Sequence, residues 1–296
     1  MYEIAPLRTH AMTSLTGRSP SIPNSLAAST QTLPTMYDLP SEFPEEPGLP
    51  DEFHDYQPQL LSRTLRLKDY ADNNQFTGTD LNVYYDTNNT LWHKRPDWFL
   101  AVDVPRWYNG HDWRMSYVTW HEEKSPTVIV EFLSLNTEKE DLGRFYRKSD
   151  KVPGSNIEPP ANAQFIPLTE ADKQNKTAPP DKFTVYEQYL KTPHYIVYSR
   201  YTQNLRYFKH NGLCYEEQVL NSQRPLIWLD DLSIGLGLWN DYYKGVLGPL
   251  LRWCDAEGNW CPTDTEQERQ AKEQAQAQAH KLAEKLRELG IDPDSL

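Results

Sequence analysis

The sequence has few cysteines and no long apolar run, and both shortages exclude whole classes of protein. Its three cysteines, Cys214, Cys254 and Cys261, are odd in number and form no CxxC pair. A disulfide framework and a zinc site are therefore disfavoured, and a reducing cytoplasm is the expected location. No stretch approaches the roughly 20 apolar residues that span a bilayer, and the N-terminus lacks the basic and apolar segments of a secretory signal. We therefore expect no membrane partner.

A basic stripe is also missing. The formal net charge is −12, and residues 36–60 hold seven Asp or Glu and no Lys or Arg, which leaves the body of the chain close to neutral. Proteins that bind nucleic acid through their own surface charge usually show a basic patch or stripe. A metal-dependent enzyme that acts on a polyanion can do without one, because the metal supplies positive charge at the site.

Four segments differ in composition. Residues 1–35 are rich in Ser, Thr and Pro without any period, which predicts a disordered extension. Residues 36–60 are acidic and Pro-rich, and we expect them to form an extended arm along the body. Residues 61–261 have the composition of a folded domain. Residues 262–296 are rich in Ala, Gln and Glu and predict a helical tail.

The body contains many short segments that are rich in β-branched and aromatic residues. An antiparallel meander of strands is predicted over 80–86, 97–104, 115–121 and 127–134. Further strands are predicted over 194–200, 204–210 and 213–220, with short strands and turns over 233–262. The polar segment 135–180 is too long for a plain connection, so we expect a loop or lid there. A helix is predicted within 179–193, between Pro180 and Pro193.

The tail has two interpretations. A long helix is predicted over 265–290, with Thr263 or Asp264 able to cap it and Gly290 able to end it. One side of this helix carries the leucines Leu282, Leu286 and Leu289. Such a helix is either exposed to solvent on all sides or pairs with a second copy in a coiled coil, which would make the protein a homo-oligomer.

One carboxylate interrupts the most apolar of the predicted strands. In "TVIVEFLS" (127–134), Glu131 shares a face with Ile129 and Leu133, because side chains alternate along a strand. Both faces are apolar, so this strand is predicted to be central. A carboxylate that is buried without a partner loses several kcal/mol of solvation. Glu131 therefore needs a cation, a hydrogen-bond network or a metal.

Asp97 is the candidate partner of Glu131. It follows Pro96 and opens the predicted strand 97–104. If that strand lies near 127–134, the two carboxylates converge, and they repel each other unless a divalent cation lies between them. Ligation by oxygen atoms alone suits Mg²⁺ or Mn²⁺.

The order of these residues resembles a known nuclease pattern. "PD" followed by a strand with "ExL" resembles the PD-(D/E)xK nuclease superfamily, although Leu133 occupies the place of the usual lysine. The runs "RPDWF", "PTVIVEFLSLNTEKEDLG" and "DKFTVYEQYLKTPHYIVYSRYTQNLRYF" resemble the Uma-type putative restriction endonuclease family, and the similarity covers roughly residues 36 to 296. In that family the lysine has moved to the following helix, where this sequence has Lys182.

The resemblance implies a fold, a reaction and a set of roles. The expected fold is a restriction-endonuclease-like α/β (α+β) core, with a central mixed sheet flanked by helices and a long C-terminal helix. The expected activity is Mg²⁺-dependent hydrolysis of DNA phosphodiester bonds. Asp97, Glu131 and the backbone carbonyl of Phe132 would hold the metal. Lys182 would orient or deprotonate the attacking water and stabilise the phosphorane.

Other candidate residues and a second function stay open. Asp80 is a possible fourth acid, for which a turn role is favoured, and Asp103 lies on the face of Asp97 but far along the strand. Cys254 and Cys261 are expected to be reduced thiols. Five histidines lack metal-ligand spacing, and these are His93, His111, His121, His194 and His210. The alternative function is a catalytically silent binding or assembly module that acts through the acidic arm and the helical tail.

Overall fold

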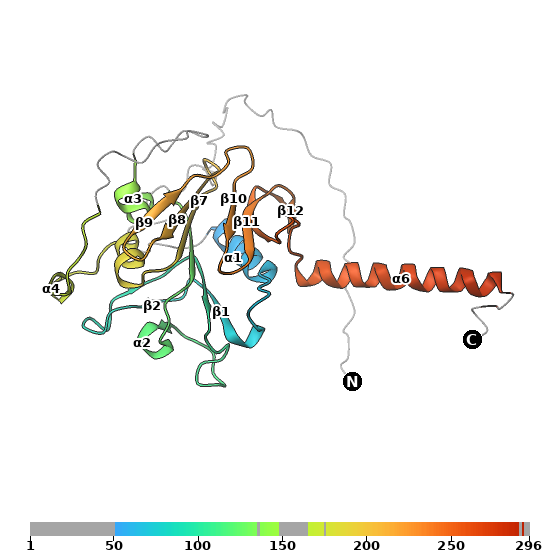
Figure 1. Cartoon of the computed structure of the whole chain (residues 1–296), viewed down its shortest axis with the longest axis horizontal. Coiled ribbons are helices and arrows are strands. Elements are labelled where there is room, and N and C mark those ends of the chain that lie inside the picture. The colour runs from blue at the N-terminus through green and yellow to red at the C-terminus, as the bar shows by residue number, and fades with distance from the viewer. Residues whose placement is uncertain (1–50, 135–136, 148–164, 175, 290–291, 293–296) are drawn as a thin grey trace, which may run out of the picture. The chain divides into compact units, whose positions relative to one another are not determined.

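A six-stranded mixed sheet forms the centre of the protein. The computed structural model describes residues 51–134, 137–147, 165–174, 176–289 and 292 (Figure 1). The strand order is β1-β4-β6-β7-β8-β9, with β6 and β7 parallel and the other neighbours antiparallel. The strands are β1 (Gln75–Thr79), β4 (Trp98–Val102), β6 (Val128–Phe132), β7 (His194–Ser199), β8 (Asn204–His210) and β9 (Tyr215–Gln218). Helices flank this sheet, which confirms the expected α/β fold class.

Strand β6 is central, as its apolar faces predict. It lies between β4 and β7, and all five of its residues are buried. Val128, Val130 and Phe132 pack into one hydrophobic cluster, whereas Ile129 packs into another together with Leu133. The alternation of side chains thus divides the interior into two cores, one on each face of the sheet.

A second sheet and a helix cover the first of these faces. The antiparallel strands β10 (Leu226–Leu229), β11 (Ile234–Trp239) and β14 (Leu250–Cys254) form this sheet, and α1 (Glu52–Thr64) packs beside it. Trp98 of β4 meets Trp253 of β14 with ring centroids 5.8 Å apart. A hairpin is formed by β12 (Tyr242–Tyr243) and β13 (Val246–Leu247). The four strands from β11 to β14 confirm the short strands expected over 233–262, whereas β10 precedes that range and was not predicted.

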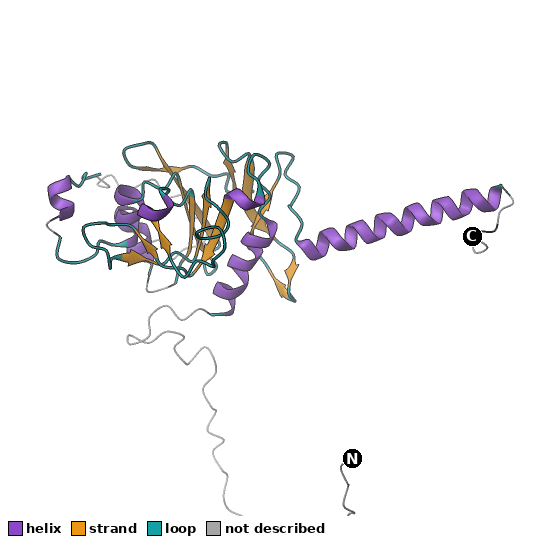
Figure 2. Ribbon diagram, turned by 90° about the horizontal axis from the view of Figure 1, so that it is seen from below, coloured by secondary structure: helices purple, strands orange, loops and turns teal. Residues whose placement is uncertain are grey.

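Short helices and a small sheet cover the other face. The helical segments are α3 (Glu138–Leu142), η2 (Gly143–Phe145), α5 (Lys182–Thr184) and the π-helical turn η3 (Val185–Tyr189). The small sheet consists of β3 (His93–Lys94), β2 (Val83–Tyr84) and β5 (Tyr117–Val118), followed by α2 (Thr119–Glu122). Figure 2 shows the strands in the middle of the domain with helical segments on either side.

The predicted meander is wrong in part. Segments 97–104 and 127–134 pair antiparallel as β4 and β6, but 80–86 and 115–121 contribute β2 and β5 to the small sheet, where they run parallel. The edge strand β1 takes their place beside β4. The sequence of β1 does not read as a strand, because it contains Gly78, a residue that is unfavourable inside strands. Glycine is needed there, since a Cβ at that position would lie 2.3 Å from the Phe99 ring.

The acidic arm is also different from the prediction over its last part. Residues 1–35 and 36–50 lie outside the described residues, but α1 begins at Glu52 and makes a regular helix in place of an extended arm. The Asp51 side chain caps the helix by accepting from the His54 backbone N–H at 3.1 Å. Leu60 and Leu61 are fully buried, so burial of this face outweighs the helix-breaking effect of Pro58.

The segment 135–180 is not a plain loop. Its residues 138–145 form α3 and η2, with Asp141 and Leu142 buried, and its residues 170–174 form α4 (Glu170–Gln174). Residues 148–164 lie outside the described part of the chain. The helix predicted within 179–193 is confirmed as α5 and η3, and β7, β8 and β9 confirm the three strands that follow it.

The tail is a helix, α6 (Asp264–Glu288), whose cap is Thr263. Thr263 and Glu266 form a reciprocal capping box, and Glu266 also pairs with the buried guanidinium of Arg252. No residue of α6 is buried, and its pairing with a second copy stays a prediction. Gly290 lies outside the described residues. None of the described helices is both long and apolar enough to cross a membrane.

Candidate active site

The pairing of β4 with β6 brings Asp97 to Glu131. Trp98 pairs with Val130, and one more step of the same register places Asp97 opposite Glu131. Opposite residues of an antiparallel pair project from the same face, with Cβ atoms about 5 Å apart. The Phe132 backbone N–H donates to Asp97 Oδ2 at 2.6 Å, which ties the acid to the end of β6. The two carboxylates are thus neighbours on the sheet, and their role as metal ligands stays a prediction.

Glu131 is fully buried and both of its oxygens are occupied. Lys182 Nζ donates to Oε2 at 2.9 Å, and the Tyr186 hydroxyl donates to Oε1 at 2.6 Å. Burial raises the pKa of Glu131 to about 7, against the lowering effect of the Lys182 charge. Burial likewise raises the pKa of Asp97. The neighbouring positive charges therefore do not fully offset the cost of burying these two carboxylates.

Lys182 reaches this pair from the first residue of α5. Asp181 caps α5 by accepting from the Thr184 N–H at 2.7 Å, and this cap sets where Lys182 stands. Burial by itself lowers the pKa of Lys182, but the carboxylates of Asp141, Glu131 and Asp97 raise it well above its ordinary value. The lysine is therefore charged. Leu133, at the position of the usual lysine, packs in the core instead.

Asp141 is a site residue that the sequence analysis missed. It lies on α3 with only 1 % of its surface exposed, and its Oδ1 is 3.4 Å from Lys182 Nζ. Burial raises its pKa to about 7. Its position could not be read from the sequence, because Asp141 follows "NTEKE" in a polar segment that predicts a loop.

His54 is a second residue that was missed. Its Nε2 lies 3.2 Å from the Phe132 carbonyl oxygen, and its Nδ1 lies 2.9 Å from Asp51 Oδ1. Burial lowers the pKa of His54, but the hydrogen bond with Asp51 and the Asp97 charge raise it to about 9. An imidazolium donates from both nitrogens, which fits two oxygen neighbours. The helix α1, predicted as an arm, thus reaches the site.

The remaining two acids of the sequence analysis lie near opposite ends of β4. Asp80 directly follows β1 with a φ of 48° and is exposed; burial of its carboxyl nevertheless raises its pKa. Its place next to the Thr79–Trp98 pair puts it near Asp97. Asp103 lies beyond the other end of β4 and pairs with Lys124 at 3.5 Å. The positive φ of Asp80 agrees with the turn role favoured for it, and the position of Asp103 agrees with the expectation that it lies far from Asp97.

The described histidines and cysteines have structural or surface positions. In the described part of the chain, no group of three or more His, Cys, Asp or Glu side chains is arranged to hold a metal ion. His194 is buried and lies between Tyr207 and Asp231, while His93 and His111 are exposed. Cys254 and Cys261 are free thiols, as expected.

The donor set at Asp97 and Glu131 has only two carboxylate side chains, but its chemistry suits a hard divalent cation that completes its shell with other oxygen ligands. It consists of two carboxylates and the Phe132 carbonyl, all oxygen ligands. Mg²⁺ is commonly bound by one or two carboxylates, with water and substrate phosphate completing its shell. Three buried carboxylates, the third being Asp141, interact with one ammonium group, so a further positive charge would be favoured electrostatically at the site.

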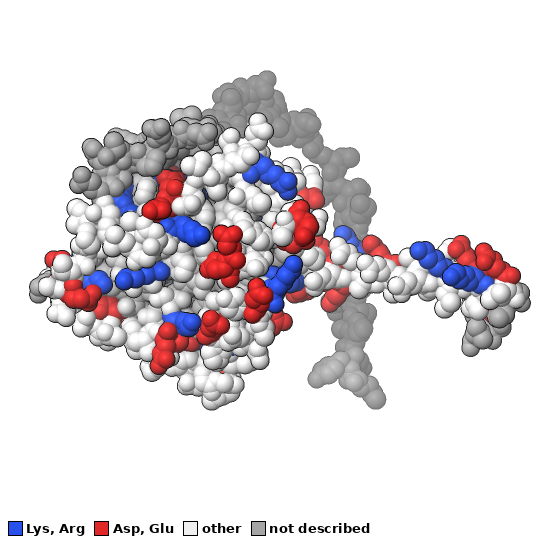
Figure 3. Space-filling model, in the orientation of Figure 1, with Lys and Arg blue, Asp and Glu red and all other residues white. Residues whose placement is uncertain are grey.

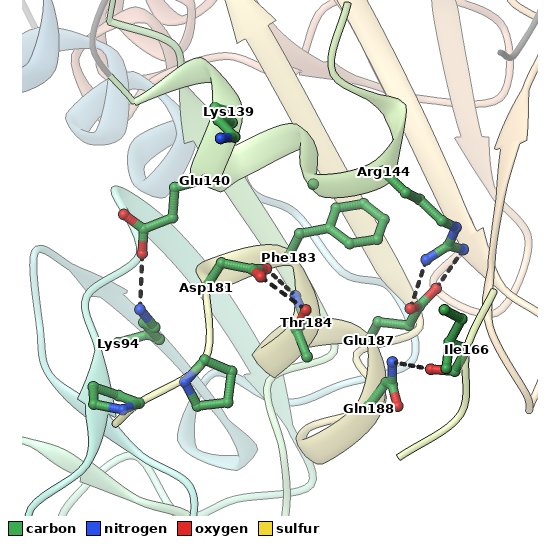
Figure 4. Close-up of a pocket in the computed structure, with 13 residues that line it drawn as sticks. Lys94, Lys139, Glu140, Arg144, Ile166, Asp181, Phe183, Thr184, Glu187 and Gln188 are labelled. Carbon is green, nitrogen blue, oxygen red and sulfur yellow. Dashed lines mark hydrogen bonds and ion pairs between the residues drawn. The ribbon is translucent and has the colours of Figure 1, made fainter. Parts of the chain in front are cut away.

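A cavity of about 700 Å³ is lined by residues of α3 and α5, such as Glu140 and Thr184, but not by Asp97, Glu131 or Asp141 (Figure 4). Two of its lining cations are already paired: Lys94 with Glu140 at 2.8 Å and Arg144 with Glu187 through two hydrogen bonds. Lys182 does not line it. The cavity therefore belongs to the packing of α3 on α5 and not to the acidic site.

The surface charges are mixed. Figure 3 shows Lys and Arg interspersed with Asp and Glu on the face in view, with no continuous basic stripe. On this face the charges agree with the near-neutral body that the sequence predicts, and a cation bound at the site would add positive charge there.

Most of the chain matches a known protein family. A family model described as "Uma2: Putative restriction endonuclease" matches residues 31–239, which is most of the chain. No curated protein and no solved structure matches the chain. The matched range contains Asp97, Glu131, Asp141 and Lys182. The chain therefore belongs to the Uma2 family of putative restriction endonucleases.

Proposed function

We propose that the protein is a divalent-cation-dependent endonuclease that hydrolyses DNA phosphodiester bonds. The observation that carries this proposal is the buried contact of Lys182 with Glu131, next to Asp97, at the ends of two paired strands. Structural ion pairs are rarely built from several acids that share one lysine, because the uncompensated charge destabilises the fold. Membership of a restriction endonuclease family supports DNA as the substrate.

The cation, Mg²⁺ or Mn²⁺, would be held by Asp97, Glu131 and the Phe132 carbonyl, and when bound it supplies Lewis-acid polarisation of a phosphoryl oxygen. Asp97 is held in place by the Phe132 N–H, and Glu131 by the Tyr186 hydroxyl. These contacts orient the two carboxylates before any ligand arrives, which lowers the cost of binding. Lys182 places a permanent positive charge beside them and stabilises negative charge that develops on the phosphate.

The decisive experiment is cleavage of supercoiled plasmid and of single-stranded DNA with Mg²⁺ or Mn²⁺, with EDTA as the blank. Glu131→Gln and Lys182→Ala should each lower the cleavage rate by about a hundredfold or more. Lys209→Ala is the matched control, because Lys209 is half exposed and its nearest acid, Asp230, lies 3.9 Å away on the surface. Cleavage that survives in both site variants would disprove the proposal.

The second candidate is a binding or assembly module with a silent nuclease fold. Its support is α6, a 25-residue helix with no buried residue, whose Leu282 and Leu289 are 61 % and 75 % exposed. Titration calorimetry with Mn²⁺ separates the candidates. Absence of binding by the wild type favours the module, whereas binding that is lost in Asp97→Asn favours the nuclease. Sedimentation of the chain with and without α6 measures whether a second copy is the partner.

A further inference from the structure

The proposed cation ligands are already engaged by donors of the chain itself. Glu131 Oε2 accepts from Lys182, and Asp97 Oδ2 accepts from the Phe132 N–H. The Phe132 carbonyl faces His54. The Phe132 N–H is a neutral donor and can coexist with a nearby cation, whereas the Lys182 ammonium group, 2.9 Å from Glu131 Oε2, is repelled by a cation on that same oxygen. Cation binding at Glu131 therefore requires Lys182 to move.

Asp141 provides an alternative acceptor for the Lys182 ammonium group. Its Oδ1 is fully enclosed, has no hydrogen-bond partner among the described residues, and lies 3.4 Å from Lys182 Nζ. The rest of the carboxylate is held by a hydrogen bond with Thr137. A buried oxygen without a partner is costly, so a stronger contact with the ammonium group would stabilise it. Moving Nζ by less than about 1 Å would bring it to charge-assisted hydrogen-bond distance.

We propose that Asp141 receives the Lys182 ammonium group when a divalent cation binds between Asp97 and Glu131. Lys182 then leaves Glu131 Oε2 and hydrogen-bonds to Asp141 Oδ1. This inference rests on the proposed function. Asp141 acts as a positioning residue: it keeps Lys182 charged and inside the site while freeing a carboxylate oxygen for the cation. The exchange would explain how a lysine on a helix can serve a site whose strand carries Leu133 instead.

The alternative is that Asp141 acts on the cation directly, as a ligand or as a nearby negative charge. The two roles differ in one respect. A positioning role works through Lys182 and disappears when the lysine is absent, whereas a direct role persists. A double-mutant cycle measures this difference, because it isolates the coupling between two residues.

The test is titration calorimetry with Mn²⁺ alone on four proteins: wild type, Asp141→Asn, Lys182→Met and the double variant. In the wild-type background, Asp141→Asn should weaken Mn²⁺ binding about tenfold, since Lys182 then stays on Glu131. In the Lys182→Met background the same change should weaken binding by less than about threefold. Glu140→Gln is the control for a lost negative charge on the same helix, because its carboxylate pairs with Lys94. It should change the Mn²⁺ affinity little.

An equal loss in both backgrounds, or no loss in either, would overturn the inference and leave the proposed nuclease function untouched. A wild type that binds no Mn²⁺ would instead overturn the proposed function. Circular dichroism checks that each variant folds. A second measurement needs no Asp141 variant: the side-chain ¹⁵N signal of Lys182, assigned by its absence in Lys182→Met, should shift on saturation with Mg²⁺. A signal that does not move contradicts the exchange.

Discussion

The two faces of strand β6 are equally buried and yet chemically opposite. On one face Val128, Val130 and Phe132 meet the second sheet, whose β-strands bring large apolar side chains such as Trp253. On the other face Glu131 lies among Ile129 and Leu133, under helices that bring Asp141 and Lys182. Burial alone therefore does not separate a core from a site. The difference comes from what the covering elements supply.

The largest expected loss of stability comes from moving the carboxylate by one residue, to the other face of β6. Val130→Glu would bury a carboxylate against apolar side chains of the second sheet such as Trp253, because the Arg252 guanidinium of β14 is already engaged by Glu266 and the Cys261 carbonyl. It should cost about 4 kcal/mol or more of unfolding free energy. Urea unfolding followed by circular dichroism measures it. Glu131→Gln is the control and should remain folded. A stable Val130→Glu protein would show that the apolar face tolerates charge.

A smaller effect concerns pH. Burial raises the folded-state pKa of Glu131 to about 7, above its ordinary value of about 4.5. A raised carboxyl pKa contributes stability that is complete below pH of about 4.5 and is lost as the pH rises through about 7. The unfolding free energy of the wild type, minus that of Glu131→Gln, should therefore fall by about 3 kcal/mol between pH 4.5 and 7.5 in EDTA.

Urea unfolding at several pH values tests this fall, and Mg²⁺ should restore the lost stability at pH 7.5 because it binds the folded state. The subtraction matters, since Asp141 has a raised pKa as well and His54 titrates at higher pH. A difference that stays flat or rises with pH would contradict the assignment of Glu131 as a buried acid short of positive charge.

The smallest expected effect is a difference in stability between two Tyr→Phe variants, one on each face of the sheet. The Tyr186 hydroxyl donates to the Glu131 carboxylate, whereas the Tyr198 hydroxyl donates to the Pro249 carbonyl at 3.0 Å. Hydrogen bonds to charged groups are worth about 1.5–3 kcal/mol and neutral ones about 1 kcal/mol. Tyr186→Phe should therefore destabilise the protein about twice as much as Tyr198→Phe. Equal thermal shifts in the two variants would remove the distinction between the faces.

Much of the candidate site could be predicted from local patterns. Glu131 stands out because a carboxylate interrupts an apolar run, and Asp97 because Pro-Asp opens the neighbouring strand. Lys182 needed the family resemblance, since a lysine near a helix start has no distinctive local signal. Asp141 and His54 could not be predicted. Each lies in a segment whose Pro or polar content predicts an arm or a loop, and tertiary burial makes both segments helical.

The sequence by itself determined the alternation along β6, the central place of that strand, the helical tail and the family. These follow from side-chain periodicity and from local motifs, which act over a few residues. Only the tertiary structure decided that β1 replaces β2 beside β4, that Asp141 meets Lys182 and that His54 meets the Phe132 carbonyl. Asp141 and Lys182 are 41 positions apart in the sequence, and His54 and Phe132 are 78 positions apart. They depend on how the covering elements pack, which no local pattern encodes.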